Sequence, residues 1–271
     1  MISFPPCKIN LGLNILSKRP DGYHNIATCF YPIPWTDMLE IIPSSEFSFS
    51  SSGLVIPGDS YTNLCVKAYQ LLKDDFQFSP VKIHLHKVIP MGAGLGGGSS
   101  DGAHALVMLN EVMSLNLSET QLQRYALQLG SDCPFFLRHA PKLGSGRGEI
   151  LQNVSLSLKG KFIVIIKPDI HVATADAYAG VKPKLPQVDL KDVLENRSVR
   201  DWRKFLTNDF EESVFTRYPA IGEIKESLYR AGAVYASMSG SGSSVFGIFE
   251  NKVDLKERFA DHIYWSGVVK H

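Results

Sequence analysis

The fold of this chain is decided by the stretch Ile89-Pro90-Met91-Gly92-Ala93-Gly94-Leu95-Gly96-Gly97-Gly98-Ser99-Ser100-Asp101, in which glycines crowd between two regular elements. Residues 81–89 before it alternate apolar and polar side chains, which is the period of a strand. Residues 101–113 after it repeat apolar side chains at helical spacing, and we expect Ser99, Ser100 or Asp101 to cap this helix. Because the first amides of a helix lack backbone partners and attract anions, the sequence predicts a phosphate-binding loop.

Three other assignments compete for this loop. Residues 92–97 satisfy the G-x-G-x-x-G spacing of a dinucleotide-binding loop, but that fold needs a parallel strand after the helix. Here a capping box, Ser118-Glu119-Thr120-Gln121, starts a second helix that ends near Gly130. The Walker pattern fails because Gly98 stands where its lysine belongs. A flexible linker is the last alternative, and the regular elements on both sides argue against it.

Composition favours an ordinary globular protein with a small-molecule partner. The 271 residues are 44% hydrophobic, which suits one large domain or two small ones. The 28 basic and 27 acidic residues nearly balance, so nucleic-acid binding is not expected. Scattered cysteines and the absence of a leader pattern predict free thiols and a cytoplasmic location, and no segment reaches the roughly 18 apolar residues of a membrane span.

The N-terminal region predicts a hairpin of two strands. Residues 7–15 alternate strictly, which puts Lys8 and Asn10 on one strand face, within reach of the same anion, although a merely solvated face is the alternative. Pro20-Asp21-Gly22 is a turn signal and places Tyr23 and His24 at the hairpin mouth. A turn packed by an aromatic ring, without any ligand, is the alternative here.

Further along, Asp132 follows a helix end in Gly130-Ser131-Asp132-Cys133-Pro134-Phe135 and is the candidate catalytic base, with an Asx turn or a helix cap as the alternative. Residues 143–148 are a glycine-rich, mobile piece that could be only a tight turn. Ser239–Ser244 is either a flexible hairpin loop or a second anion-contacting nest. His84 and His86 share a strand face without an apparent third metal ligand, so we expect them to be solvated.

The second half of the chain predicts an α+β arrangement. We expect a strand at 162–166, a loop at 172–185, helices near Leu190 and Trp202, a helix at 219–231, and strands at 233–238 and 245–249.

Taken together, three motifs resemble the signatures of the kinase superfamily named for galactokinase, homoserine kinase, mevalonate kinase and phosphomevalonate kinase (GHMP kinases). They are Lys8-Ile9-Asn10-Leu11, Pro90 to Ser100, and Ser239 to Ser244. Within the superfamily, the chain is most similar to the members that phosphorylate a cytidine diphosphate-linked methylerythritol in the non-mevalonate isoprenoid (terpenoid) pathway. The segments that carry this similarity are residues 19–24, 94–100 and 130–135. The likeness runs nearly end to end.

This resemblance implies an α+β fold of two domains, with the active site in the cleft. Residues 1–155 would form the ATP-binding domain with a left-handed β-α-β unit, and residues 156–271 a ferredoxin-like domain. ATP with Mg²⁺ would phosphorylate the 2-hydroxyl of the methylerythritol moiety. The metal ligands stay unassigned, because the extra glycines shift Ser99 and Ser100 relative to the magnesium-binding serine of mevalonate-type members.

The resemblance also implies roles for particular residues. Asp132 would accept the hydroxyl proton, and Lys8 would pair with Asp132 and the transferring phosphate. Tyr23 and Tyr178 would stack the pyrimidine while His24 reads its edge, and Asn10 and Thr174 would contact polar groups of the substrate. The nucleotide would be held by Pro90, Met91, Gly92, Ala93, Gly94, Leu95, Gly96, Gly97, Gly98, Ser99 and Ser100. A related kinase with a smaller acceptor, such as mevalonate or homoserine, and a non-catalytic binding module are the alternatives.

Overall fold

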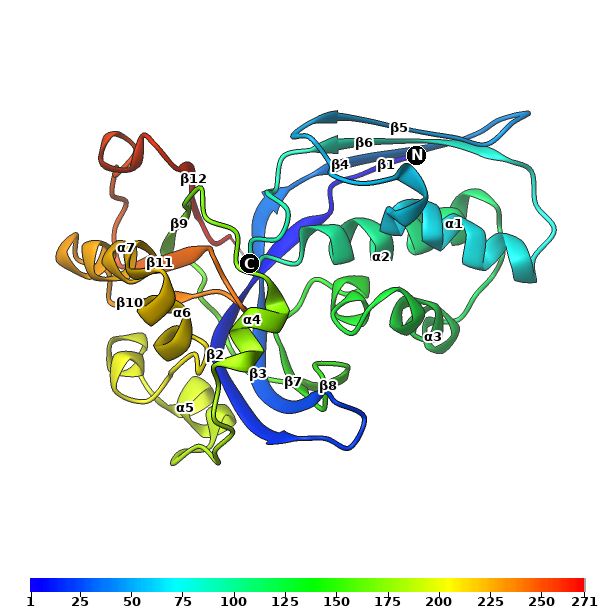
Figure 1. The fold of residues 1–271 in the computed structure, drawn as a ribbon. Helices are drawn as coiled ribbons and strands as arrows, with labels where there is room; N and C mark the ends of the chain where they lie inside the picture. The colour runs from blue at the N-terminus through cyan, green and yellow to red at the C-terminus, as the bar shows by residue number, and fades with distance from the viewer. Residues whose placement is uncertain (271) are drawn as a thin grey trace. The chain divides into compact units, whose positions relative to one another are not determined.

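A computed structural model describes residues 1–270 of the chain (Figure 1). The chain divides into two compact units, each assembled from separate segments. Unit 1 consists of residues 1–7, 35–91 and 96–139, and unit 2 of residues 8–34, 92–95 and the chain from Ala140 onward. Because neither unit corresponds to a single cut in the sequence, the domain boundary after residue 155 remains a prediction.

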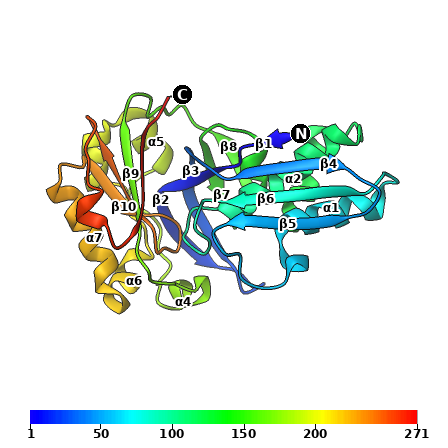
Figure 2. The same ribbon diagram turned by 90° about the horizontal axis from the view of Figure 1, so that it is seen from above.

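Unit 1 is a sheet with helices on one face (Figures 1 and 2). Its strands follow the order β1-β4-β6-β5, and β5 and β6 are parallel neighbours joined through α1, so a β-α-β unit is present. The predicted strand before the glycine stretch is confirmed as β6. The elements of unit 1 are β1 (Ile2–Ser3), β4 (Met38–Pro43), β5 (Ser48–Gly53), the 3-10 helix η1 (Ser60–Thr62), α1 (Leu64–Asp75), β6 (Val81–Lys87), α2 (Gly97–Val112), α3 (Glu119–Leu129) and the 3-10 helix η2 (Cys133–Leu137).

The succession of α2 and α3 confirms the argument against a dinucleotide-binding fold, since a helix and not a strand follows the glycine-loop helix. Ser118 caps α3 in the predicted box, with its hydroxyl accepting from the Gln121 amide and its own amide donating to the Gln121 side chain. The two strand histidines differ from expectation. His84 and His86 are half-buried and hydrogen-bonded to the hydroxyls of Ser50 and Ser52 on β5, so they are not simply solvated.

Unit 2 contains two sheets among the described residues. One follows the order β2-β3-β7-β8, and the other β10-β11-β9-β12. Its elements are β7 (Lys142–Ser145), β8 (Ile150–Asn153), β9 (Phe162–Lys167), α4 (Thr174–Ala179), α5 (Leu190–Asn196), the 3-10 helix η3 (Val199–Lys204), α6 (Glu211–Arg217), α7 (Pro219–Arg230), β10 (Tyr235–Met238), β11 (Val245–Phe249), the 3-10 helix η4 (Glu257–Phe259) and β12 (Ile263–Val268). Most of the long strands β2 (Pro6–Lys18) and β3 (His24–Thr36) belongs to this unit.

The sheet β10-β11-β9-β12 is ferredoxin-like. Numbered in chain order from β9, its strands lie as 2-3-1-4, and the neighbours β10–β11, β11–β9 and β9–β12 are all antiparallel. The apolar run 162–166 is central in the sheet and buried throughout, which explains why its sequence does not alternate. Helix α7 packs on β10 and β11, where Ile221, Ile224 and Leu228 enter the core. The predicted fold class is therefore confirmed.

Several short elements of unit 2 differ from the sequence prediction. The expected loop at 172–185 contains the short helix α4, and β7, β8, α6 and β12 were not predicted. All of them are short, and their stability depends on packing and not on a long periodic pattern. By contrast, α7 ends as predicted, with Gly232 at a φ of +96° just beyond it.

The four cysteines all lie in the described part of the chain, where they are buried and form no disulfide. Among residues 1–270, no helix combines the length and the apolar character needed to cross a membrane.

Candidate functional site

The residues of the glycine stretch are divided between the two units. Residues 92–95 belong to unit 2, whereas Pro90, Met91 and the residues from Gly96 onward belong to unit 1. Gly92, Gly94 and Gly96 have φ values of +60°, +75° and +69°, a region that favours glycine. These three glycines are thus required by the backbone path of the stretch.

In unit 2, Gly94 packs directly against the loop Ser239–Ser244. A Cβ on Gly94 would lie 1.9 Å from the Ser239 carbonyl oxygen, so only glycine fits. The Ser239 hydroxyl donates to the Gly94 carbonyl at 2.9 Å, and the Ser244 amide donates to the Ala93 carbonyl at 3.2 Å. Ser239, Ser243 and Ser244 are fully buried, so the flexible-loop alternative for 239–244 is wrong.

Lys8 and Asn10 lie on the same face of β2, as predicted, but that face is not solvated. Lys8 Nζ donates to Asn10 Oδ1 at 2.6 Å and to the Gly94 carbonyl at 2.9 Å, and the Lys8 amide donates to the Leu95 carbonyl. Asn10 in turn donates to Thr28 Oγ1 at 2.9 Å. With exposed fractions of 3% and 2%, Lys8 and Asn10 are held in place before any ligand arrives.

In unit 1, helix α2 begins earlier than the sequence suggested. Gly96, in the left-handed conformation, is its N-cap, and Gly97 is its first residue. The prediction that Ser99, Ser100 or Asp101 caps the helix is therefore wrong, because all three lie inside it. The Ser100 amide already bonds to the Gly96 carbonyl, and the first-turn amides before it are the ones that a helix leaves for an anion.

Helix α2 carries a buried charge cluster that the sequence analysis missed. Lys87 Nζ contacts Asp37 Oδ2 and, at 2.7 Å, Asp101 Oδ2, and all three side chains are at most 3% exposed. The signal was present, because Lys87 continues the apolar face of β6 formed by Val81, Ile83 and Leu85. Burial opposes the charge of Lys87, but the two carboxylates outweigh it and raise the pKa of its ammonium group.

The two carboxylates of the cluster differ in their support. Asp37 Oδ1 also accepts hydrogen bonds from the amides of Val88 and Ile89, at 2.6 and 2.8 Å. Within residues 1–270, Asp101 Oδ1 has no hydrogen-bond partner. Burial and the neighbouring Asp37 raise the pKa of Asp101 to about 7 despite Lys87, so Asp101 is the carboxyl that takes up a proton.

This assignment predicts how stability changes with pH. Between pH about 4 and about 7 the folded chain holds a proton on Asp101 that the unfolded chain has lost, so this carboxyl contributes stability at low pH that disappears as the pH rises through about 7. We expect the free energy of unfolding of the wild type to fall with pH in this range relative to Asp101→Asn, which stays neutral. Urea denaturation at a series of pH values measures the difference. Parallel curves would contradict the assignment, and Asp59→Asn, an exposed cap in the same unit, is the control.

Asp101 and Lys87 also line a cavity of about 140 Å³ in unit 1. The remaining lining residues are Ile56, Pro57, Thr62, Asn63, Leu64, Leu85, Met91 and Gly98. Most of these side chains are apolar, and Gly98 lies in the first turn of α2, where an added Cβ would meet nothing within 4 Å. The cavity therefore combines apolar walls, a few polar groups and a helix N-terminus, as nucleotide sites do.

Asp132 precedes η2 and is half-buried. In the part of the chain that the structure describes, its side chain makes no capping hydrogen bond to η2, although its carbonyl accepts from the Phe135 amide at 3.2 Å. The helix-cap alternative for this carboxylate is therefore wrong. Its role as the catalytic base stays a prediction.

The hairpin mouth in unit 2 brings together two of the predicted substrate-binding side chains. The His24 ring stacks on the Tyr178 ring with centroids 4.8 Å apart and 19° between the planes. Burial, with Lys18 nearby, lowers the pKa of His24, which favours the neutral ring. Thr174 Oγ1 lies 3.3 Å from Ser241 Oγ, so the Ser239–Ser244 loop also reaches α4.

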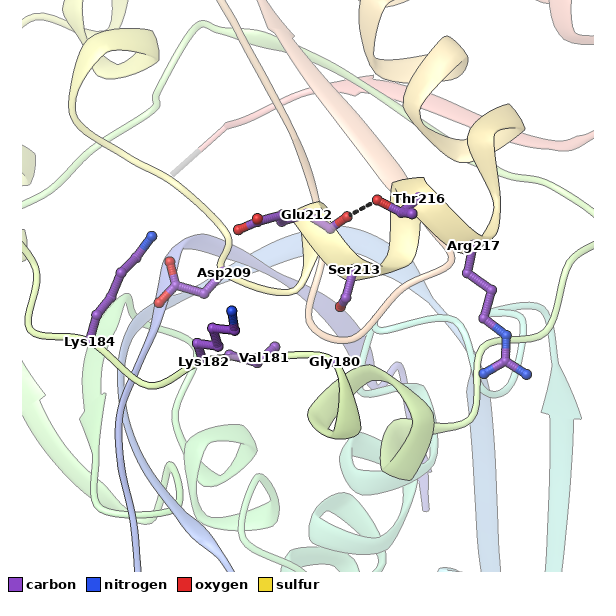
Figure 3. A pocket seen from close by; sticks show the side chains of 9 residues that line it. All are labelled: Gly180, Val181, Lys182, Lys184, Asp209, Glu212, Ser213, Thr216 and Arg217. Atoms are coloured by element: carbon purple, nitrogen blue, oxygen red, sulfur yellow. Dashed lines mark hydrogen bonds between the residues drawn. The ribbon is translucent and has the colours of Figure 1, made fainter.

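Helix α6 fixes the helix that carries Thr174 and Tyr178. A Cβ on Gly180, at the end of α4, would lie 2.4 Å from Ser213 Cβ, so the two segments touch. Arg217 of α6 bonds to Asp176 of α4 at 2.9 Å. Figure 3 shows the adjoining cavity of about 530 Å³, lined by Gly180, Val181, Lys182, Lys184, Asp209, Glu212, Ser213, Thr216 and Arg217.

Two family descriptions match the chain. Residues 63–139 match "GHMP kinases N terminal domain", and residues 190–262 match "GHMP kinases C terminal". With the fold above, these matches define a small-molecule kinase of the GHMP class, which uses ATP as the phosphate donor. The resemblance inferred from the three motifs is thus confirmed.

The chain is 55% identical over 253 residues to the 4-diphosphocytidyl-2-C-methyl-D-erythritol kinase of Cytophaga hutchinsonii, covering 93% of both chains. It is 45% identical over 273 residues to that of Porphyromonas gingivalis, covering 99% of this chain and 100% of the other. A solved 4-(cytidine 5'-diphospho)-2C-methyl-D-erythritol kinase superposes with a TM-score of 0.84, 31% identity and full coverage of both chains. The chain belongs to the family of 4-diphosphocytidyl-2-C-methyl-D-erythritol kinases.

More distant structures share only the fold. A solved mevalonate kinase superposes with a TM-score of 0.71 at 14% identity, and the match covers the full length of both chains.

Proposed function

We propose that this enzyme transfers the γ-phosphoryl group of ATP to the 2-hydroxyl of 4-diphosphocytidyl-2-C-methyl-D-erythritol, giving the 2-phosphate and ADP. The observation that carries the choice of substrate is the stack of His24 on Tyr178 at the hairpin mouth. A pyrimidine needs a flat apolar face and an edge reader, and a smaller acceptor such as mevalonate or homoserine offers no base for these rings. The relatives named above support the same choice.

We propose Asp132 as the group that accepts the proton of the acceptor hydroxyl. A carboxylate in hydrogen-bonding reach of an alcohol lowers the barrier for its attack on phosphorus. Lys8 is proposed to stabilise the negative charge on the transferring phosphoryl oxygens. Its support is the fixed position of Nζ, because an ammonium already bonded to Asn10 Oδ1 and the Gly94 carbonyl needs little reorganisation.

For the nucleotide, we propose that the backbone of Pro90 to Ser100 binds the phosphates and that the cavity beside Asn63 and Asp101 receives the base. The first turn of α2 supplies amide donors, and Gly98 leaves room for close approach. Mg²⁺ is expected to arrive with ATP, held by phosphate oxygens. We assign it no protein ligand, because the extra glycines shift Ser99 and Ser100 relative to the magnesium-binding serine of mevalonate-type members.

We propose five residues that bind the substrate: Asn10, Tyr23, His24, Thr174 and Tyr178. We also propose that the enzyme is located in the cytoplasm.

Phosphoryl transfer from ATP should be assayed with the cytidine diphosphate-linked alcohol, with methylerythritol 4-phosphate, with mevalonate and with homoserine. Turnover with the first acceptor alone, with a new phosphate monoester at the 2-position by phosphorus NMR, is expected. Turnover with mevalonate or homoserine would reassign the substrate, and no transfer to any of them would favour a binding module.

A further inference from the structure

Tyr23 is the most exposed of the proposed substrate-binding aromatics, with an exposed fraction of 55%. An exposed tyrosine samples several rotamers, and stacking a base on it costs the entropy of selecting one. Its backbone is already fixed, because the Tyr23 amide donates to Asp21 Oδ1 at 3.1 Å and its carbonyl accepts from the Arg19 amide at 2.8 Å. These hydrogen bonds fix the backbone of Tyr23 but do not fix the orientation of its ring.

The turn between β7 and β8 supplies a partner for the ring. The guanidinium carbon of Arg147 lies 4.8 Å from the centroid of the Tyr23 ring, which is within the range of a cation–π contact. Residues 143–148 were predicted to be either a mobile piece or only a tight turn, and they form a turn held by backbone hydrogen bonds. The Gly146 carbonyl accepts from the Ile26 amide of β3 at 2.7 Å, and the Gly148 amide donates to the Ser145 carbonyl at 3.0 Å.

The turn also holds the arginine itself. Glu149 accepts a hydrogen bond from the Arg147 amide, and its carboxylate lies 3.8 Å from Arg147 Nε. The side chain of Arg147 is 35% exposed, so its contact with the ring is partly shielded from water. In the hairpin turn itself, Arg19 Nη2 lies 3.0 Å from Asp21 Oδ2. The Tyr23 amide therefore bonds to a carboxylate that is itself paired, and the Tyr23 ring contacts Arg147.

We propose that Arg147 is a positioning residue for the substrate, because its guanidinium packs on the Tyr23 ring and holds it in the orientation that stacks the cytosine. This inference rests on the proposed substrate but goes beyond it, since none of the three family motifs contains Arg147. Arg147 acts through Tyr23, so its effect should appear in the binding of the cytidine-containing substrate and leave ATP unaffected. A cation–π contact at a partly exposed site corresponds to roughly a two- to fivefold change in affinity.

The test is a set of variants measured with the full-length enzyme. For Arg147→Gln, we expect the Kd of 4-diphosphocytidyl-2-C-methyl-D-erythritol by titration calorimetry, and its KM, to rise about two- to fivefold, with kcat and the KM for ATP unchanged. Arg147→Lys keeps the positive charge and should restore most of the affinity. Arg203→Gln is the matched control, because Arg203 lies 4.0 Å over the ring of Tyr229, which has no proposed role in binding.

A double-mutant cycle with Tyr23→Leu decides between positioning and direct contact. If Arg147 acts through the ring, Arg147→Gln has no further effect in the Tyr23→Leu background. An equal loss in both backgrounds would overturn the proposal and assign Arg147 to the substrate itself. An unchanged Kd in Arg147→Gln, or an equal rise in the KM for ATP, would also overturn it. Failure of the proposed function is distinguishable, since the wild type would then neither bind nor phosphorylate this substrate.

Discussion

Asp132→Asn is expected to lower kcat by about 10²- to 10⁴-fold while ATP binding stays near the wild-type level. The amide has nearly the shape of the carboxylate, so the backbone hydrogen bond from Phe135 to the Asp132 carbonyl should persist. What the variant loses is the ability to accept the hydroxyl proton. Single-turnover phosphoryl transfer and fluorescence titration with an ATP analogue separate the chemical step from binding.

The matched control for Asp132→Asn is Asp189→Asn. Asp189 caps α5 through its side chain, and asparagine caps helices equally well, so this variant should keep full activity. Turnover of Asp132→Asn at the wild-type rate would remove Asp132 from the mechanism. A parallel loss of ATP affinity would instead assign it to nucleotide binding.

Gly94→Ala is expected to lower the free energy of unfolding by roughly 2 to 5 kcal/mol and to abolish most activity. The methyl group would stand 1.9 Å from the Ser239 carbonyl oxygen and 3.2 Å from that of Gly242, at a φ of +75° that L-residues avoid. The loop must therefore move away from 239–244. Such a shift would displace the Gly94 carbonyl that accepts from Lys8 Nζ.

Gly160→Ala isolates the steric part of this effect. Gly160 has a φ of +82° in the same unit, but an added Cβ there meets nothing within 4 Å. It should lose only the roughly 1 to 2 kcal/mol of the left-handed backbone and keep its activity. Urea denaturation of both variants gives the difference. Equal losses would mean that the packing of Gly94 on Ser239 contributes nothing.

Sequence patterns predicted the local order of elements well where one periodicity persisted over many residues. The strand before the glycine stretch, the capping box at Ser118 and the helix ending before Gly232 all rest on interactions within a few residues, which a local pattern can specify. The start of α2 was misplaced because Gly96 caps it through backbone conformation, which leaves no side-chain signal. Helix α4 was missed because six residues give too few turns to show a period.

Some residues of the candidate site could be recognised from the sequence, and others could not. The Lys8 motif, the glycine stretch, the Tyr23-His24 turn and Asp132 were all recognisable in the sequence, since each depends on particular residues at short spacing. The Lys87 cluster was overlooked although its lysine sits on an apolar strand face, because a charge at that position indicates burial only when its partners are known. Those partners, Asp37 and Asp101, lie 50 and 14 residues away.

By itself, the sequence determined that a strand, a glycine loop and a helix follow one another, and which side chains could carry the chemistry. The tertiary structure alone decided that Lys8 bonds to a carbonyl 86 residues away, that the Ser239 loop is buried against Gly94 across 145 residues, and that Arg147 packs on Tyr23. The reason is physical. Periodicity and turn chemistry act between near neighbours in the chain, whereas these contacts exist only after the hydrophobic cores of the units have fixed the paths of distant segments.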